Sequence, residues 1–327
     1  MIISRTPFRI SFFGGGSDYP DWYENNNGQV LSTTINKYCY INIRYLPNFF
    51  NYNYRIRYYK TEEANKISDI EHPVVREALK YYSIKDGIEL VHNADLPARS
   101  GLGSSSTFTV GLINTLHALK KEIATKRMLA SSAINLEQNI IKENVGSQDQ
   151  VAAAFGGFNN IKFTKNNFQV NQLPLSKNRI KELEGNLMLF FTGFQRSASN
   201  IAAKQIKSIK QNKIDLSNSV SLVDEGIDIL VKDKKIDDFG KLLDEQWIIK
   251  KNYSDDVTNE NINKIYKTAI NAGAIGGKLL GAGGGGFILF YVKKKYQISV
   301  RKSLKNLLYV PFEFESNGSQ IVYFSNQ

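Results

Sequence analysis

A loop of small residues followed by hydroxyls could hold a phosphate group. It runs from Pro97 to Ser106 and reads PARSGLGSSS. Its glycines allow close backbone approach, and the first amides of a helix beginning at Ser104 would offer partial positive charge to an anion. The serine hydroxyls could donate to phosphate oxygens or join the ligands of Mg²⁺. Because serine is a common helix N-cap, the spacing alone fits an ordinary helix start equally well.

Two acidic side chains could serve such a loop. Glu137 lies in a stretch with a helical pattern, and Asp149 follows in the segment GSQDQ. Phosphoryl transfer to a hydroxyl uses one carboxylate as a metal ligand and another as the base. Each residue alone is an ordinary acidic side chain, so this interpretation requires both to reach the loop.

Two further glycine-rich segments lie near the ends of the chain. The strand-like FRISFF leads into Gly14-Gly15-Gly16-Ser17-Asp18, for which a surface turn is the alternative. KLLGAGGGG precedes an apolar run at 287–292 and formally contains G-x-G-x-x-G. A dinucleotide fingerprint follows a strand and opens a helix, whereas this segment leads into a strand, and Leu279 stands where a Walker A loop needs Ser or Thr. Consecutive glycines cost backbone entropy, so we interpret them as a site of close ligand approach.

Composition excludes several classes of protein. The chain has 327 residues, a net charge of +11, one cysteine and three histidines, too few for a disulfide scaffold or a Cys/His zinc site. We find no signal peptide and no apolar run of about 18 residues, so we expect a cytoplasmic protein with no membrane partner. Lysine clusters at 204–210 and 293–295 lack interleaved aromatic residues. We therefore expect no nucleic-acid partner, although the charge leaves a basic nucleic-acid-binding protein as the alternative of a different class.

Hydrophobic periodicity predicts strands and helices that divide into two halves. The polar segment 162–186 suggests a boundary, giving domains 1–165 and 166–327. In the first half we expect strands at 8–13, 30–35, 38–45, 55–59 and 88–92, and helices at 104–120 and 126–143. In the second half we expect strands at 187–192 and 287–292, and helices at 197–212, 217–232, 236–250 and 258–271.

Taken in order, these segments resemble the three motifs of the sugar and isoprenoid kinase family that includes galactokinase, homoserine kinase, mevalonate kinase and phosphomevalonate kinase. PARSGLGSSS and KLLGAGGGGF together carry the resemblance, which covers nearly the whole chain. It implies an α+β fold of two domains. The N-terminal domain would have ribosomal-protein-S5-like α/β topology and the C-terminal domain would be ferredoxin-like α+β, with ATP and substrate between them.

The resemblance also implies roles for individual residues, with ATP and Mg²⁺ as cofactors. Asp149 matches the catalytic base, and Arg9 matches a nearby cation that would offset charge on the transferring phosphoryl group. Ser105 and Glu137 match the metal ligands. The ATP-binding loop would comprise Pro97, Arg99, Ser100, Gly101, Leu102, Gly103, Ser104, Ser105 and Ser106, with the Gly281–Gly286 loop packed against it.

The acceptor segment departs from galactokinase, which reads G-E-H-T-D-Y where this chain reads GGGSDY. Loss of the glutamate opens space and removes a negative charge, which favours a longer or phosphorylated sugar. The string FFGGGSDYPDWY resembles kinases that convert D-glycero-D-manno-heptose 7-phosphate to the 1,7-bisphosphate, on the route to GDP-heptose for bacterial surface polysaccharide.

We therefore expect a small-molecule sugar phosphate as the partner. A neutral sugar such as fucose, or another sugar phosphate, is the alternative. The expected acceptor-binding residues are Gly15, Gly16, Ser17, Asp18, Arg196, Gly283 and Gly284. Arg196 could instead form an interdomain salt bridge.

Overall fold

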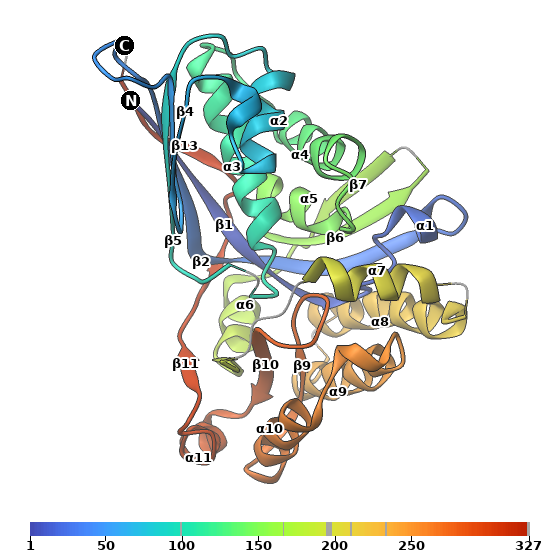
Figure 1. Ribbon diagram of the computed structural model, residues 1–327. Coiled ribbons are helices and arrows are strands. Elements are labelled where there is room, and N and C mark those ends of the chain that lie inside the picture. The colour runs from blue at the N-terminus through green and yellow to red at the C-terminus, as the bar shows by residue number, and fades with distance from the viewer. Residues whose placement is uncertain (99, 166, 194–197, 210, 233, 326–327) are drawn as a thin grey trace.

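Two long antiparallel strands, β1 (Ile2–Phe13) and β2 (Gly28–Tyr45), run along the middle of the molecule (Figure 1). The computed structural model describes residues 1–98, 100–165, 167–193, 198–209, 211–232 and 234–325, without the side chains of 198–200. The gap predicted between the strands 30–35 and 38–45 is a bulge in β2. Pro7 pairs with Tyr38 and Phe8 with Ile35, so Asn36 and Lys37 are extra residues that bend the strand without ending it.

The two strands belong to a nine-stranded sheet with the order β13-β1-β2-β5-β3-β4. Strands β6 and β12 also pair with β2, and β7 pairs with β6. The pairing is antiparallel except between β3 and β5. The remaining bounds are β3 (Tyr54–Arg57), β4 (Thr61–Ala64), β5 (Ile88–Ala94), β6 (Phe158–Thr164) and β7 (Asn167–Gln172).

Helices cover both faces of the long strands. Helix α3 (Ser104–Leu119) packs on β1 and β2 together with α5 (Gln148–Phe155), and α2 (Pro73–Tyr81) and α4 (Lys126–Ile134) lie outside them. From the second half of the chain, helix α8 (Lys213–Val231) contacts both strands and α9 (Asp237–Lys251) contacts β1. The predicted helix at 104–120 is confirmed as α3, which is buried on nearly all sides.

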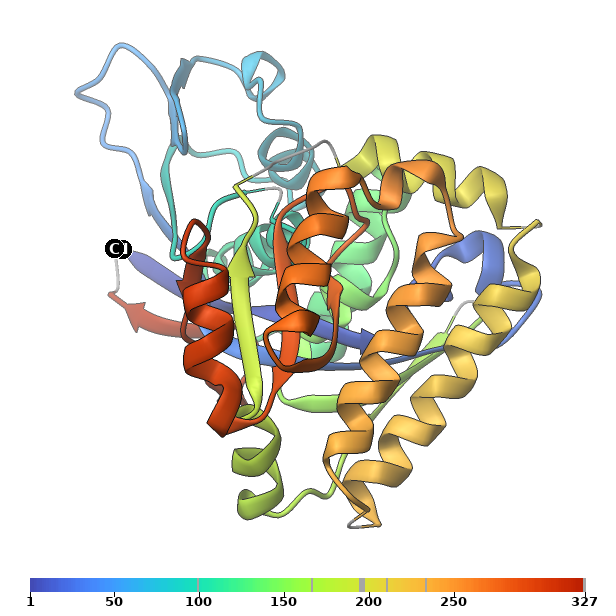
Figure 2. The same ribbon diagram turned by 90° about the horizontal axis from the view of Figure 1, so that it is seen from below.

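The second sheet is antiparallel and has the order β11-β8-β10-β9. Its strands are β8 (Leu187–Phe191), β9 (Ala274–Leu279), β10 (Phe287–Val292) and β11 (Leu308–Val310). Helices α9, α10 (Glu260–Asn271) and α11 (Lys294–Ser303) lie beside it, as Figure 2 shows from below. The apolar run 287–292 is β10, and every one of its residues is buried, which confirms the predicted strand.

The chain returns to the first sheet at its end. Strand β12 (Phe314–Glu315) pairs with β2, and β13 (Gln320–Phe324) pairs with β1, so both termini lie together in Figure 1. The boundary at 165 and 166 falls in the turn between β6 and β7, which belong to one hairpin. The division into 1–165 and 166–327 therefore stays a prediction, and the first sheet includes strands from both sides of it.

The predicted helix at 126–143 is helical as far as Ile140, but its second part is a π-helix and not an α-helix. Helix α4 ends at Ile134, and a π turn, Asn135–Ile140, continues the chain and carries Glu137. Such wide turns inside helices often occur at functional sites.

The predicted linker 162–186 also contains regular structure, namely β7 and α6 (Lys177–Glu184). The short helix α1 (Pro20–Tyr23) follows β1, and α7 (Ala198–Ser208) precedes α8.

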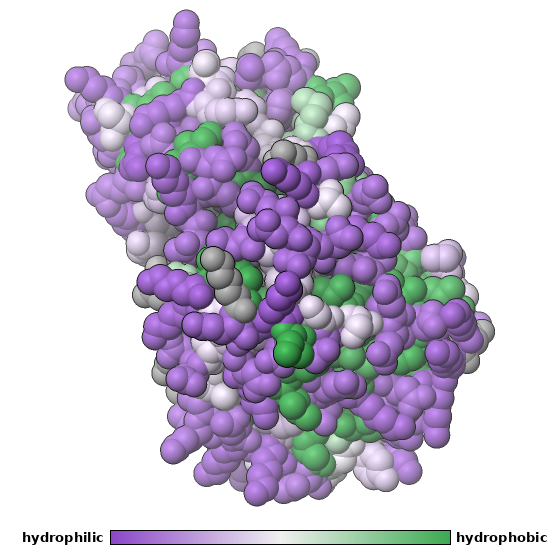
Figure 3. Space-filling view, turned by 90° about the vertical axis from the view of Figure 1, so that its right-hand side faces the viewer, coloured by the Kyte–Doolittle hydropathy of each residue, from purple (hydrophilic) through white to green (hydrophobic). Residues whose placement is uncertain are grey.

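Across the ranges that the structure describes, no helix combines the length and apolar character that crossing a bilayer requires. The face shown in Figure 3 is mostly hydrophilic, with small apolar areas between charged side chains.

Candidate active site

Two glycine-rich loops meet backbone to backbone at the start of α3. Gly101 has φ +81°, and a Cβ built on it would lie 2.5 Å from the carbonyl oxygen of Leu280. Gly281 has φ +69°, and its Cβ would lie 2.4 Å from the Cα of Gly101. The amide of Phe287 also donates to the carbonyl of Ser100 at 3.0 Å. The expected packing of the Gly281–Gly286 loop against the phosphate loop is confirmed, and only glycine permits this approach.

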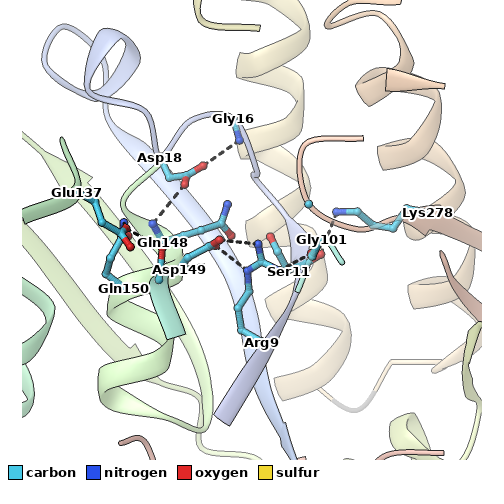
Figure 4. Close-up of polar contacts among 12 residues, drawn as sticks. Arg9, Ser11, Gly16, Asp18, Gly101, Glu137, Gln148, Asp149, Gln150 and Lys278 are labelled. Carbon is cyan, nitrogen blue, oxygen red and sulfur yellow. Dashed lines mark hydrogen bonds and ion pairs between the residues drawn. The ribbon is translucent and has the colours of Figure 1, made fainter. Parts of the chain in front are cut away.

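Arg9 connects Asp149 to the phosphate loop (Figure 4). Its Nε donates to Oδ1 of Asp149 at 2.7 Å and its Nη2 to Oδ2 at 2.9 Å, while Nη1 donates to the carbonyl of Gly101 at 2.8 Å. Arg9 is buried on β1, whereas the Asp149 side chain keeps 24% of its surface exposed at the start of α5. A bidentate pair of this kind fixes the orientation of the carboxylate. Asp149 is therefore held beside the loop and open to a substrate.

Glu137 lies behind the loop and is fully buried. Its carboxylate accepts hydrogen bonds from Ser106 Oγ at 2.8 Å and Thr109 Oγ1 at 2.6 Å, and also from the side-chain amide of Gln150. Burial raises the pKa of Glu137 to about 7. Of the serines in the loop, Ser106 reaches this carboxylate, while the Ser105 side chain is exposed in the first turn of α3.

A carboxylate beside hydroxyl oxygens fits Mg²⁺, which takes oxygen ligands and usually one or two carboxylates together with substrate phosphates. Glu137 and Ser106 would hold the ion here. Elsewhere in the described ranges, as here, no group of three or more His, Cys, Asp and Glu side chains is arranged for a metal.

The turn after β1 is fixed by two of its own polar side chains. Asp18 accepts from the Gly16 amide at 3.0 Å and from the Gln148 amide at 3.3 Å. Burial and then the neighbouring charge of Asp149 raise the pKa of Asp18. The Ser17 hydroxyl donates to the Gly14 carbonyl at 2.8 Å and accepts from an amide of β2 at 3.0 Å. The structure thus brings Asp18 close to Asp149 and engages Ser17 with the main chain.

The remaining predicted site residues belong to the two glycine-rich loops or lie outside the described structure. The Gly284 amide donates to the Val257 carbonyl at 2.9 Å, and Gly283 packs against Val257 as well. Pro97 is exposed, Ser100 and Leu102 are buried, and Gly103 is the left-handed N-cap residue before Ser104. Arg99 and Arg196 lie outside the described residues.

Two buried lysines near the glycine loops were missed by the sequence analysis. Lys250 on α9 donates to the carbonyls of Leu279 and Gly281, and Lys278 on β9 donates to those of Ser11 and Phe12. Burial lowers the pKa of both ammonium groups, that of Lys250 to about 7. The sequence did contain signals for them, because Lys250 falls on the apolar face of α9 and Lys278 begins the segment KLLGAGGGG.

A pocket of about 370 Å³ lies at α8 and α9 and is lined by Asp224, Glu225, Asp228, Ile229, Lys234 and Asp238. Its carboxylates outnumber its one lysine, so it would repel a phosphate. The glycine loops and Asp149, rather than this pocket, carry the residues suited to phosphoryl transfer.

Comparison with known proteins agrees with this geometry. The family model for the N-terminal domain of GHMP kinases matches residues 70–157, and the model for their C-terminal domain matches 229–309. A D-glycero-alpha-D-manno-heptose 7-phosphate kinase of Campylobacter jejuni is 31% identical, with 97% of each chain covered. The chain belongs to the GHMP kinase family. The Campylobacter jejuni relative is a sugar kinase, and this chain is an ATP-dependent carbohydrate kinase with the two-domain α+β fold of the family.

Two further relatives bear on the acceptor. A crystal structure of a D-glycero-D-manno-heptose 1-phosphate kinase from Bacteroides thetaiotaomicron is similar with a TM-score of 0.76 and 27% identity, over 100% of both chains. A bifunctional fucokinase/GDP-fucose pyrophosphorylase of Arabidopsis thaliana is 27% identical over 88% of this chain and 29% of its own length.

Proposed function

We propose that this GHMP kinase transfers the γ-phosphoryl group of ATP to the anomeric hydroxyl of D-glycero-D-manno-heptose 7-phosphate, giving the 1,7-bisphosphate for GDP-heptose synthesis. The observation that carries the reaction type is the ion pair between Asp149 and Arg9. Nε and Nη2 of Arg9 hold the carboxylate, and Nη1 donates to the Gly101 carbonyl. The likeness to the Campylobacter jejuni 7-phosphate kinase along nearly the whole chain supports the acceptor. We assign the reaction to the cytoplasm, where ATP is supplied.

Asp149 accepts the proton of the acceptor hydroxyl as its oxygen bonds to the γ-phosphorus. The bond from that phosphorus to the bridging oxygen of ADP breaks, and ADP leaves with the electron pair. Arg9 orients the carboxylate and adds positive charge near the transferring group. The first amides of α3 bind the phosphates.

Glu137 and Ser106 would hold Mg²⁺, which when bound neutralises charge on the nucleotide phosphates. This replaces Ser105 with Ser106 in the proposed metal pair, because Ser106 Oγ lies 2.8 Å from the Glu137 carboxylate. Ser105 stays a candidate phosphate contact at the exposed first turn of α3.

A neutral sugar such as fucose is the second candidate acceptor, and the likeness to the Arabidopsis thaliana fucokinase favours it. Gly15 supports the larger, phosphorylated acceptor, because a Cβ built there meets no atom nearer than 3.7 Å. The glycine thus leaves unfilled the volume of a side chain that would lie in ordinary contact with Ser11 and Gln148.

The role of Asp149 is tested with Asp149→Asn, using ADP release with Mg-ATP and a panel of heptose 7-phosphate, mannose, fucose and galactose. We expect kcat to fall by about 10²- to 10⁴-fold, because the amide cannot accept the proton. Asp21→Asn, on the exposed surface of α1, is the matched control and should retain activity. Full activity of a folded Asp149→Asn enzyme would remove Asp149 from the mechanism.

A further inference from the structure

Two buried polar groups beside Asp149 have no hydrogen-bond partner. They are the side-chain carbonyl oxygen Oε1 of Gln148 and the hydroxyl of Ser11, in residues that are only 8% and 6% exposed. Buried polar atoms are normally paired, because leaving one unpaired destabilises the folded protein. Ser11 lies on β1, the strand that carries Arg9, and Gln148 lies on α5, the helix that carries Asp149.

The Ser11 hydroxyl and the side-chain amide that carries the unpaired Gln148 oxygen both lie near Gly15. A Cβ built on Gly15 would lie 3.7 Å from Ser11 Oγ and 3.7 Å from the side-chain nitrogen of Gln148, with nothing closer. Gly15 is also absent from the glycines with positive φ in the described backbone. Its conformation therefore does not demand glycine, and what the missing side chain provides is room.

The main chain of both residues is fixed while the ends of their side chains stay available (Figure 4). The Ser11 carbonyl accepts from Lys278 Nζ at 3.0 Å, and the Gln148 amide donates to Asp18 at 3.3 Å. Gln148 directly precedes Asp149 in the first turn of α5, and Ser11 follows Arg9 by two positions on β1. The positions of the two polar groups are thus fixed relative to the base, Asp149, and to Arg9, which orients it.

We propose that Gln148 and Ser11 bind the acceptor sugar through the hydroxyl next to the one that Asp149 deprotonates, which is the C2 hydroxyl of an anomerically phosphorylated sugar. Gln148 Oε1 accepts the hydrogen of that hydroxyl, and Ser11 Oγ donates to its oxygen. A sugar hydroxyl can donate one hydrogen bond and can also accept one, so a single hydroxyl can pair with both Gln148 Oε1 and Ser11 Oγ. This inference rests on the proposed function and adds the residues that position the acceptor at Asp149.

The test measures kcat and KM for both substrates in Gln148→Met and Ser11→Ala. Loss of one hydrogen bond to the acceptor should raise its KM by about 10-fold, which corresponds to about 1.4 kcal/mol. The KM for ATP should stay within about twofold of wild type, and stability should not fall, because a buried unpaired polar group is removed. Gly15→Ala should likewise raise the acceptor KM by filling the space, with only ordinary contacts to its neighbours.

Asn160→Leu is the matched control. Its side-chain oxygen is also buried and unpaired, but it lies on β6, so the variant should leave the acceptor KM unchanged. An acceptor lacking the C2 hydroxyl provides the readout that a merely structural role would not move. With it, wild type and Gln148→Met should have the same KM.

An unchanged acceptor KM in Gln148→Met and Ser11→Ala would overturn the inference while wild-type turnover upheld the proposed function. Equal increases in KM for ATP and acceptor, or an undiminished effect with the C2-deoxy acceptor, would also overturn it. A wild-type enzyme that phosphorylates no sugar of the panel would overturn both proposals together.

Discussion

Glu137 is a buried carboxylate whose cost to the fold should depend on pH. Burial raises its pKa from 4.5 to about 7, and a shift of that size corresponds to about 3 kcal/mol at about 1.4 kcal/mol per pKa unit. Below pH 4.5 the group is protonated in both the folded and the unfolded chain and costs nothing. Between pH 4.5 and 7 the unfolded chain ionises first, so stability falls as pH rises, and above the folded pKa the full penalty applies.

Glu137→Gln should remove this penalty without leaving its neighbours unpaired. Thr109 can still donate to the introduced carbonyl at the Oε1 position, while the introduced amide at the Oε2 position can donate to the Ser106 hydroxyl and to Gln150, which turns its own unpartnered oxygen toward it. In urea unfolding without Mg²⁺, the variant should gain up to about 3 kcal/mol over wild type between pH 4.5 and pH 8. Its kinase activity should fall, because the carboxylate that we propose as a ligand of Mg²⁺ is lost.

The matched control for this experiment is Glu260→Gln, which removes an exposed carboxylate in the first turn of α10. A stability difference between Glu137→Gln and wild type that stayed constant from pH 4.5 to pH 8 would refute the reasoning. The same pH slope in the control would refute it as well, since burial would then not be the cause.

Other predictions concern the two glycine loops. Gly101→Ala places a Cβ 2.5 Å from the Leu280 carbonyl oxygen, at a residue with φ +81°. The variant should lower the melting temperature and raise the KM for ATP by more than about 10-fold. A wild-type KM for ATP would contradict the loop packing. Lys250→Met removes the donor to the Leu279 and Gly281 carbonyls, so the KM for ATP should rise by about 3- to 10-fold. Because burial lowers the pKa of Lys250 from 10.5 to about 7, stability is lost in wild type as pH falls through that range, and Lys250→Met should gain stability relative to wild type as pH is lowered from 10 to 7 in urea titrations. A gain in the opposite direction would show that the ammonium is not held in a desolvated site.

The sequence predicted regular elements best where their own hydrophobic pattern decides the structure. The run 287–292 is apolar throughout and forms β10, and the helix from Ser104 follows from its periodicity. The gap at 36–37 was also real, but it is a bulge, because pairing with β1 holds the two parts of β2 in one strand. Pairing between distant segments decided that outcome, as it did for β12 and β13, which join a sheet that begins at residue 2.

The motifs identified the residue types of the site, but only the fold shows their partners. Arg9 and Asp149 are 140 positions apart in sequence and form a bidentate pair. The change from α4 to a π turn sets where Glu137 lies, and no periodicity signals that change. Ser106 and Thr109 are three positions apart on one face of α3, so their joint contact with a carboxylate could have been inferred, whereas choosing Ser106 over Ser105 required the orientation of the helix.

Phosphorus NMR of the wild-type reaction with Mg-ATP and D-glycero-D-manno-heptose 7-phosphate tests the central claim most directly. We predict a new phosphate resonance on the anomeric carbon that grows in step with ADP, while the 7-phosphate signal persists. Transfer to fucose in preference to the heptose phosphate would contradict the proposed acceptor, and the absence of transfer to any sugar would contradict the proposed reaction.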